Sequence, residues 1–298
     1  MPKELTHWMV AERAAASLPG GSRLKGIIAQ HRPAYLGGAV LPDTLAHVFR
    51  GPHHPKARML SHRFHDASGN SYAPLIGAER RFPDGVPAAL FSCFLGVICH
   101  MEADMALHPY VYAATGSGGI GEHYRLETAI DSHFLKKGAA PAQRRLDRLL
   151  CPSTKEVMVS AAGFLFDPEG ELPQRALTNA LALHCRFQAM YDRAFWKLLV
   201  RVLGRLCGPP FSEQRHLFYP WRSSGAGSIA GVSGRWRHPE SGELKGETID
   251  DLARQAVERT VAVFRRIEAA GSLAAALGAP PGANLLTGLH GVTKSTKA

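Results

Sequence analysis

Two groups of metal-ligand side chains lie close together in this sequence. The first comprises His100, Asp104 and His108, and the second comprises His123 and Glu127. Within each group the residues are four apart, and four residues of an α-helix turn by only about 40° beyond one full turn. Each group therefore shares one face of a helix. Imidazoles and carboxylates on one face are the donors that a divalent metal such as zinc binds.

The segment before His100 indicates that the first group is buried. Residues 88–99 read AALFSCFLGVIC, which is almost wholly apolar. When a buried helix continues into imidazoles and carboxylates, these groups must pair or bind a metal, because an isolated charge is very costly inside a protein. The sequence therefore predicts a metal site on a buried helix.

Each of these groups also has a simpler explanation. His100 and Asp104 can form a buried hydrogen-bonded pair without a metal. His108 can bond the last carbonyls of a helix. His123 and Glu127 can form a solvent-exposed pair worth a few tenths of a kcal/mol. The spacing alone leaves these alternatives open.

Helical patterns dominate the rest of the chain, and alternating strand patterns are almost absent. The predicted fold is all-α, a multi-helix bundle with long loops, a helical C-terminal extension and at most one small hairpin. The last helix has a capping pattern, with Thr248 at its start and Asp251 three residues later. The predicted helices cover residues 6–18, 88–108, 122–135, 174–207 and 248–270.

The sequence divides into a metal-binding helical core, residues 1–140, and a helical extension, residues 141–298, which we expect to pack on the core as one compact domain. Residues 51–87 are rich in Pro, Gly, His and aromatic residues, which predicts a long irregular loop. The last 15 or so residues are expected to be frayed.

The composition favours a soluble protein with an anionic partner. The 298 residues are 45% hydrophobic and 20% charged, and the net charge is +10. A phosphate ester, an acidic membrane surface or a nucleic acid would suit that charge. Five cysteines without a C-x-x-C pair and the lack of a signal peptide predict reduced thiols and a cytoplasmic location. The apolar runs are too short for a membrane span, and no amphipathic helix stands out.

Further ligand-type residues precede the two groups. His7 lies in the first predicted helix, Asp43 follows a proline, and His62 lies in the segment SHRFHDASGNSY, residues 61–72. His62 has rivals in three neighbouring histidines, which are His53, His54 and His65.

The order of these residues resembles the zinc-dependent phospholipase C family over about residues 5–135. That family has a Ser/Thr-His pair in an N-terminal helix, then an Asp before a loop, then a Ser-His-aromatic turn. A helix with His-x3-Asp and a further His follows, and His-x3-Glu comes last. The matching positions here are His7, Asp43, His62, His100, Asp104, His108, His123 and Glu127.

The resemblance implies two or three zinc ions. One ion would be bound by Asp43, His62, His100 and Asp104, and another by His108, His123 and Glu127. A third would be bound by Asp104 and His7. Zinc makes a hydroxide available near neutral pH and neutralises phosphate charge, and Asp43 would take the proton as the catalytic base.

Two differences from the family bear on these sites. Secreted members bind the third zinc through a free N-terminal Trp, whereas Trp8 is internal here, which puts the third site in question. The gap from Asp104 to His108 is four residues instead of six, so His108 stays on the same helix. The imidazoles also need hydrogen-bond partners, for which Glu102, Asp131 and Glu122 are candidates.

The expected function is a zinc-dependent phosphoric ester hydrolase of phospholipase C type that cleaves a phosphodiester, a phospholipid or a related molecule. Residues 51–87 would wall its cleft, with Phe64, Tyr72 and Phe82 near the metals. Peripheral contact with an anionic membrane is compatible with the charge, and the oligomeric state is left open. One alternative is a single-strand-type zinc nuclease, although no basic stripe interleaved with aromatics supports nucleic acid. The other is a non-catalytic, metal-stabilised helical binding module.

Overall fold

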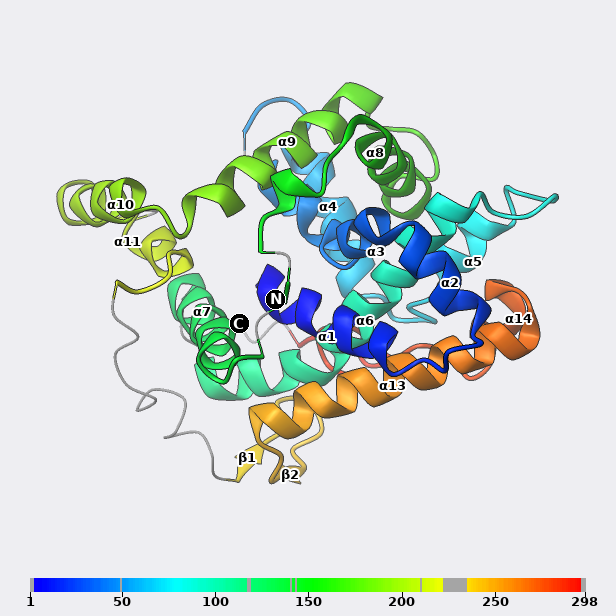
Figure 1. Ribbon diagram of the computed structural model, residues 1–298. Helices are drawn as coiled ribbons and strands as arrows, with labels where there is room; N and C mark the ends of the chain where they lie inside the picture. The colour runs from blue at the N-terminus through cyan, green and yellow to red at the C-terminus, as the bar shows by residue number, and fades with distance from the viewer. Residues whose placement is uncertain are drawn as a thin grey trace.

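The computed structural model describes residues 3–48, 50–116, 119–139, 141–142, 144–209, 211–221 and 235–295. Helices make up nearly all of the regular structure in these ranges (Figure 1). The strands described are β1 (Trp236–Arg237) and β2 (Leu244–Lys245), which pair antiparallel as a small hairpin. The predicted all-α fold is confirmed.

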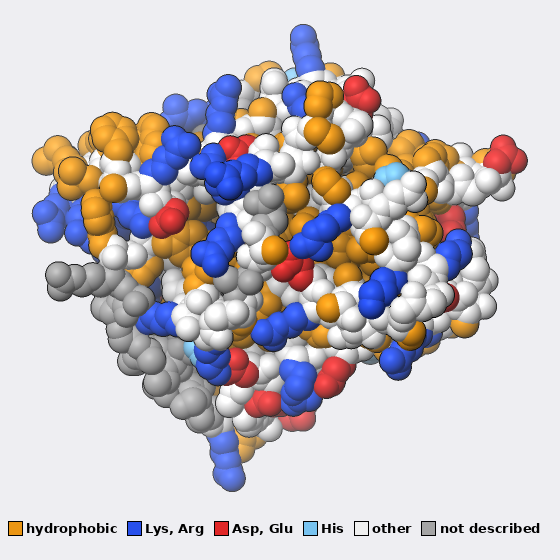
Figure 2. All heavy atoms as spheres, viewed as in Figure 1, with side chains coloured by type: hydrophobic (Ala, Val, Ile, Leu, Met, Phe, Trp, Pro, Cys, Tyr) orange, Lys and Arg blue, Asp and Glu red, His pale blue; other side chains and the backbone are white. Residues whose placement is uncertain are grey.

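The helices in chain order are α1 (Glu4–Ala16), α2 (Arg23–Gln30), α3 (Arg32–Gly38), η1 (Leu41–His47), α4 (His54–His65), α5 (Ala73–Glu79), α6 (Ala88–Thr115), α7 (Ile120–Lys136), η2 (Leu146–Arg148), α8 (Pro152–Phe166), α9 (Gln174–Met190), α10 (Ala194–Leu206), α11 (Phe211–Gln214), η3 (Arg215–Leu217), α13 (Ile249–Ala270) and α14 (Leu273–Leu277). One cluster of buried apolar side chains runs from Leu5 in α1 to Leu285 near the end of the chain. Lysines and arginines are scattered over the face shown in Figure 2.

The long helix α6 is the centre of the fold. Every residue from Leu90 to Val111 is buried, because α1, α3, α8 and α13 pack around it (Figure 1). A helix that is buried on all sides can be apolar all round, which explains its sequence. Of the described helices, α6 alone is long and apolar enough to cross a membrane, but its apolar stretch is entirely buried inside the protein. We conclude that it is a core helix.

The helix α6 continues to Thr115, beyond residue 108, although the sequence predicts that Pro109 ends or kinks the helix. Proline lacks an N–H and cannot bond the carbonyl of Met105, and the C-terminal segment packs at this point. A Cβ on Gly288 would lie 2.5 Å from the Met105 oxygen, and Gly288 has a positive φ of 65°. Asn284 and Leu285 are fully buried in the same segment. The expectation of a frayed C-terminal end is therefore wrong for these residues.

Residues 51–87 contain two helices, α4 and α5, where a long irregular loop was predicted. Each has a proline in its first turn, where a missing N–H costs nothing. In α4, Ala57, Leu60 and Phe64 are buried and recur at helical spacing. The many histidines, prolines and glycines masked this pattern in the sequence.

The predicted helix over residues 174–207 is two helices. α9 ends at Met190, and the Tyr191 carbonyl accepts a hydrogen bond from the Tyr219 N–H instead of continuing a helical ladder. Apolar residues recur at helical spacing through residues 174–207, which suggested one buried face. They do not share one face, because Leu198 and Val202 in α10 are exposed. By contrast, the predicted cap of α13 is confirmed, since Thr248 and Asp251 form a reciprocal capping box.

Two glycines bring α3 and α6 into backbone contact. A Cβ on Gly96 would lie 1.9 Å from the Tyr35 oxygen, and a Cβ on Gly38 would lie 2.0 Å from the Cys93 oxygen. No side chain fits at either position without separating the helices. The contact places the Ala39 carbonyl, at the end of α3, 3.0 Å from Nδ1 of His100 on α6.

We predict that Gly96→Ala lowers the free energy of unfolding by about 3 kcal/mol or more, because overpacking against rigid backbone cannot relax. The matched control is Gly26→Ala in α2, where a Cβ meets nothing within 4 Å. That change should raise stability by up to about 1 kcal/mol through helix propensity. Urea denaturation of both variants measures the difference, and equal effects would contradict the close contact.

Candidate metal centre

The carboxylate of Asp104 lies at the centre of a buried group of histidines. Asp104 is fully buried on α6, and four imidazoles surround it. Its oxygens lie 3.2 Å from Nε2 of His100, 3.5 Å from Nε2 of His7 and 3.7 Å from Nδ1 of His108. Nε2 of His65 lies 3.9 Å away.

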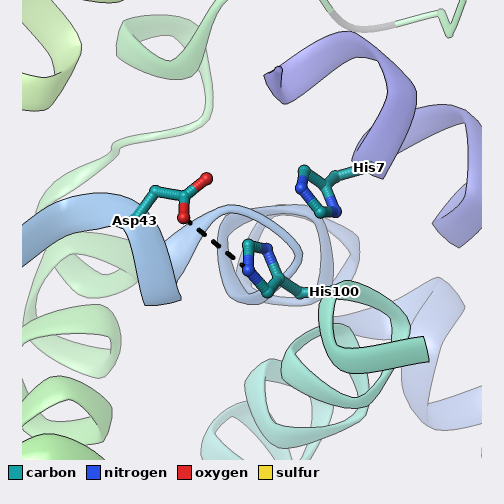
Figure 3. A group of neighbouring side chains, drawn as sticks. All are labelled: His7, Asp43 and His100. Carbon is teal, nitrogen blue, oxygen red and sulfur yellow. Dashed lines mark ion pairs between the residues drawn. The ribbon is translucent and has the colours of Figure 1, made fainter. Parts of the chain in front are cut away.

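Five elements distant in sequence bring the ligand-type residues together. His7 comes from α1, Asp43 from η1 and His65 from α4, while α6 and α7 contribute the other residues. Figure 3 shows His7, Asp43 and His100 converging from three of these elements, with Asp43 Oδ1 3.7 Å from Nε2 of His100. The rings of His7 and His100 stack with 4.0 Å between their centroids. The burial of α6 fixes the positions of its three ligand-type residues.

The buried polar atoms of this group form no hydrogen bonds among the described residues. They include both ring nitrogens of His7, both oxygens of Asp104, Oδ1 of Asp43, and Nε2 of His65, His100 and His108. Buried groups without hydrogen bonds are costly and rare, so this many together need another partner. Two ligands of a tetrahedral zinc ion, each about 2.0–2.1 Å from it, are roughly 3.3 Å apart. The separations of 3.2–3.9 Å around Asp104 match that distance better than a hydrogen bond.

Backbone carbonyls orient three of the imidazoles. Nδ1 of His65 lies 2.8 Å from the Ser61 oxygen, Nδ1 of His100 lies 3.0 Å from Ala39, and Nδ1 of His108 lies 2.8 Å from Leu285. A carbonyl can only accept, so each Nδ1 carries the proton and each Nε2 keeps its lone pair. A neutral imidazole with a free Nε2 lone pair is the form that binds metal.

The carboxylates expected to hydrogen-bond the imidazoles, Glu102, Asp131 and Glu122, contact other residues. Glu102 accepts hydrogen bonds from Tyr72 and Arg259. Asp131 accepts from the Thr6 N–H at 2.9 Å and from the Tyr219 hydroxyl at 2.7 Å, which ties α7 to α1. Glu122 pairs with Arg125 on the surface. These acids do not orient His65, His100 or His108, because backbone carbonyls already do so.

Burial and the central carboxylates set the charge of the group. Burial lowers the pKa of His7 to about 3 and that of His108 to about 3, which disfavours the charged form of both imidazoles. Burial disfavours a charged Asp104, but His108 and His100 outweigh it and hold the Asp104 pKa well below its usual value. Burial also opposes a charge on His100, yet Asp104 and Asp43 raise its pKa. Two ionised carboxylates here stabilise a cation between them.

The structure corrects one predicted ligand. The His62 side chain is 71% exposed and approaches only Asp66, with 3.8 Å from Nε2 to Oδ2. On the α4 wheel His62 lies nearly opposite the buried positions Ala57, Leu60 and Phe64. His65 is buried instead, with Nε2 3.6 Å from Oδ1 of Asp43. The helical spacing of those apolar residues was the signal that could have excluded His62.

The remaining ligand-type residues form three groups whose donor atoms all lie within 4.8 Å of one another. The groups are His65, His100 and Asp104; His7, Asp43 and His100; and His108, His123 and Glu127. In the third group, Nε2 of His123 lies 2.8 Å from Oε1 of Glu127, and burial lowers the pKa of His123. His7 thus lies among the ligand-type residues although Trp8 is internal.

The aromatic residues expected to wall a cleft near the metals pack in or against the core, although the Phe64 ring also lies 5.4 Å from the ring of His65. Phe64 packs edge-on against Phe166 at 4.9 Å, and Phe82 packs against Phe164 at 5.3 Å. Tyr72 is 3% exposed and bonds Glu102. The prediction of an apolar cleft built from these side chains is wrong.

We predict that His65→Ala removes bound metal, whereas His62→Ala leaves the metal content unchanged. His65 contributes one donor to the group around Asp104, and its loss leaves buried carboxylate charge without a cation. Elemental analysis after zinc-supplemented expression measures both variants. A chelator should lower the melting temperature of the parent and of His62→Ala, because metal binds only the folded site. Metal loss in His62→Ala alone would restore the original assignment.

Comparison with known proteins agrees with this geometry. A family model described as zinc dependent phospholipase C matches residues 6–162, which is more than half of the chain. The matched region contains every residue of the three groups. The comparisons with curated proteins and with solved structures each gave no match. The chain belongs to the zinc-dependent phospholipase C family.

Proposed function

We propose that the protein hydrolyses a phosphodiester bond of a phospholipid or a closely related phosphate ester. The observation that carries this proposal is the buried Asp104 carboxylate among imidazoles whose Nε2 atoms have no hydrogen bond. Buried polar atoms in a protein core normally form hydrogen bonds, and these do not. Zinc ions would bind such imidazole nitrogens and carboxylate oxygens. The family supports zinc, and the three groups are compatible with two or three ions.

The candidate ligands divide the work around the metals. His65, His100, Asp104 and Asp43 would hold one ion, and His108, His123 and Glu127 another, while His7 with Asp104 would serve a third. Bound zinc lowers the pKa of water to near 7 and neutralises phosphate charge. Asp43 is the candidate base, because its side chain is 10% exposed whereas Asp104 is fully buried. Its Oδ1 would hold the ion, and its other carboxylate oxygen would accept the proton of the attacking water.

A lysine from the C-terminal segment lies beside the second ligand group. Nζ of Lys294 is 3.6 Å from the centre of the Tyr112 ring, and that ring is 5.2 Å from His123. The His123 side chain is 11% exposed, which with Asp43 makes it one of the two most accessible of the ligand-type residues. Lys294 therefore supplies a cation where a phosphate would approach. We propose that it binds a non-bridging phosphate oxygen of the substrate.

We further propose that the protein works in a reducing compartment, as a cytoplasmic enzyme would. All five cysteines are free thiols, and Cys93, Cys99 and Cys185 are buried. Burial raises the pKa of Cys93 to about 12 and that of Cys99 to about 12, which keeps both protonated and unreactive.

The proposal is tested with zinc-loaded protein given mixed phospholipid vesicles, single-stranded DNA and a soluble chromogenic phosphodiester. We expect diacylglycerol from the vesicles and cleavage of the chromogenic ester, with both activities abolished by a chelator. Asp43→Asn should lower kcat at least about 100-fold for both substrates if Asp43 is the general base. Nucleotides without diacylglycerol would identify a nuclease. Fully bound zinc with none of these products would identify a non-catalytic binding module.

We predict that Lys294→Met raises KM for the soluble phosphodiester and leaves zinc content and melting temperature unchanged. The removed ammonium group packs on the Tyr112 ring and is not itself a metal ligand, so we expect its loss to act mainly on phosphate binding. Lys294→Arg keeps the charge and should keep most of the affinity. An unchanged KM in Lys294→Met, measured by initial rates, would exclude this role.

A further inference from the structure

The helix α10 has an apolar face that points into solvent. Phe195, Leu198, Val202 and Leu206 are 66%, 57%, 41% and 78% exposed. At 100° per residue these four positions lie within about 80° of the helix circumference. Val200 is the only buried residue of this helix. A soluble protein rarely exposes four large apolar side chains in one row, so the row indicates a contact surface.

The opposite side of α10 holds the helix on the body of the protein. α10 packs on α11 and η3. A Cβ on Gly204 would lie 3.1 Å from Cα of Ser212, so the helices touch through backbone. Val200 and Gly204 lie nearly opposite the exposed row on the helical wheel. The apolar row therefore faces away from the protein.

The same contacts link α10 to the metal centre. α11 packs on α7, where a Cβ on Gly121 would lie 3.3 Å from Cα of Glu213. α7 carries His123 and Glu127. The short helix α11 thus connects α10 to α7. A partner bound to α10 is therefore held in a fixed position relative to the ligand-type residues on α7.

Positive charge lies beside the apolar row. Arg201 and Arg205 are exposed on α10, Arg193 is exposed at its start, and α10 itself contains no acidic residue. Lys197 lies on the opposite side of α10, is only 10% exposed and pairs with Asp192 at 2.8 Å, so Arg201 and Arg205 are the cations next to the row. Arg193 also lines a cavity of about 520 Å³ whose other cationic residues are Lys136, Arg144, Arg145 and Arg148. Figure 2 shows hydrophobic side chains gathered at the end of the molecule that α10 occupies, with Lys and Arg around them.

The apolar row and the arginines next to it together indicate which kind of partner fits α10. A second copy of the chain would bring like charges together along the two apolar rows, with no acid on α10 to offset them. A neutral apolar groove would satisfy the row but not the arginines. An anionic bilayer surface supplies acyl chains for the row and phosphate groups for the cations.

We propose that α10 is a membrane-docking helix that lies in the surface of an anionic phospholipid bilayer with its apolar row inserted. The proposal rests on the proposed function for its purpose, since a phospholipid hydrolase must work at a lipid surface. Attachment itself is measured without hydrolysis, so the two proposals fail separately. The sequence did not reveal α10 because its residues read as the second half of one long core helix.

The experiment is flotation of the full chain with vesicles of phosphatidylcholine alone or mixed with phosphatidylglycerol. The test variant is Leu198→Gln with Leu206→Gln, and the matched control is Leu244→Gln on β2, where the leucine is 52% exposed. Parent and control should float with the mixed vesicles. The lipid concentration at which half of the protein floats should be at least about ten-fold higher for the double variant. The reason is that its α10 lacks two of the apolar side chains that insert into the bilayer.

A second pair of changes tests the charge. Arg201→Glu with Arg205→Glu should abolish the preference for mixed vesicles. Salt raised from 0.1 M to 1 M should weaken attachment of the parent, as the screening length falls from about 10 Å to about 3 Å. Both double variants alter exposed side chains, so their melting temperatures should match the parent.

Three results would overturn the proposal. Equal attachment of parent and the double leucine variant is one, and absence of attachment of the parent to either vesicle is another. The third is a dimer in sedimentation that Leu198→Gln with Leu206→Gln disrupts, which would assign the face to a second copy. Attachment through α10 without diacylglycerol production would leave the docking helix standing and remove the phospholipid substrate. The double leucine variant should cleave the soluble phosphodiester at the parent rate.

Discussion

The carboxylate of Asp104 imposes the main constraint on this structure. It is fully buried at the middle of the core helix and accepts no hydrogen bond from any described residue. An ionised carboxylate in that position is stable only beside positive charge. Imidazoles from α1, α4 and α6 approach it, and each must be neutral to bind metal, so the compensating charge has to come from cations. The helices thus surround the negative charge of Asp104, and the neutral imidazoles around it do not balance that charge.

Much of this centre could be predicted from the sequence, because α6 and α7 carry their ligands at four-residue spacing. The fold class and the cap at Thr248 followed from equally local patterns. His62 was misassigned because five histidines between residues 47 and 65 offered similar local patterns, and only packing distinguishes them. The break between α9 and α10 was missed for a related reason. Apolar spacing predicts a helical face but not whether protein or solvent lies against it.

No sequence pattern predicts the backbone carbonyls that orient the imidazoles. Ala39, Ser61 and Leu285 act through their backbone oxygens, so their side chains carry no signal of the role. Their positions depend on packing, as at Gly38 and Gly96, where backbone meets backbone. The acids near the site in sequence were more conspicuous, but they bond tyrosine, threonine and arginine. Spacing in the sequence predicts the carboxylates that would bind metal, whereas the carbonyls that orient the imidazoles depend on how the chain folds.

The hydrogen bond from His108 to the Leu285 carbonyl spans 177 residues of sequence. All the candidate ligands precede that carbonyl in order of synthesis, so a growing chain possesses every donor atom long before His108 is held in its metal-binding tautomer. Gly288 and Asn284 seat the same segment against α6 and α4. Maturation of the centre is therefore a late event in the life of the chain. A nascent or prematurely terminated polypeptide would hold its second ligand group loosely, and the metal centre would be completed only once this distal segment had docked.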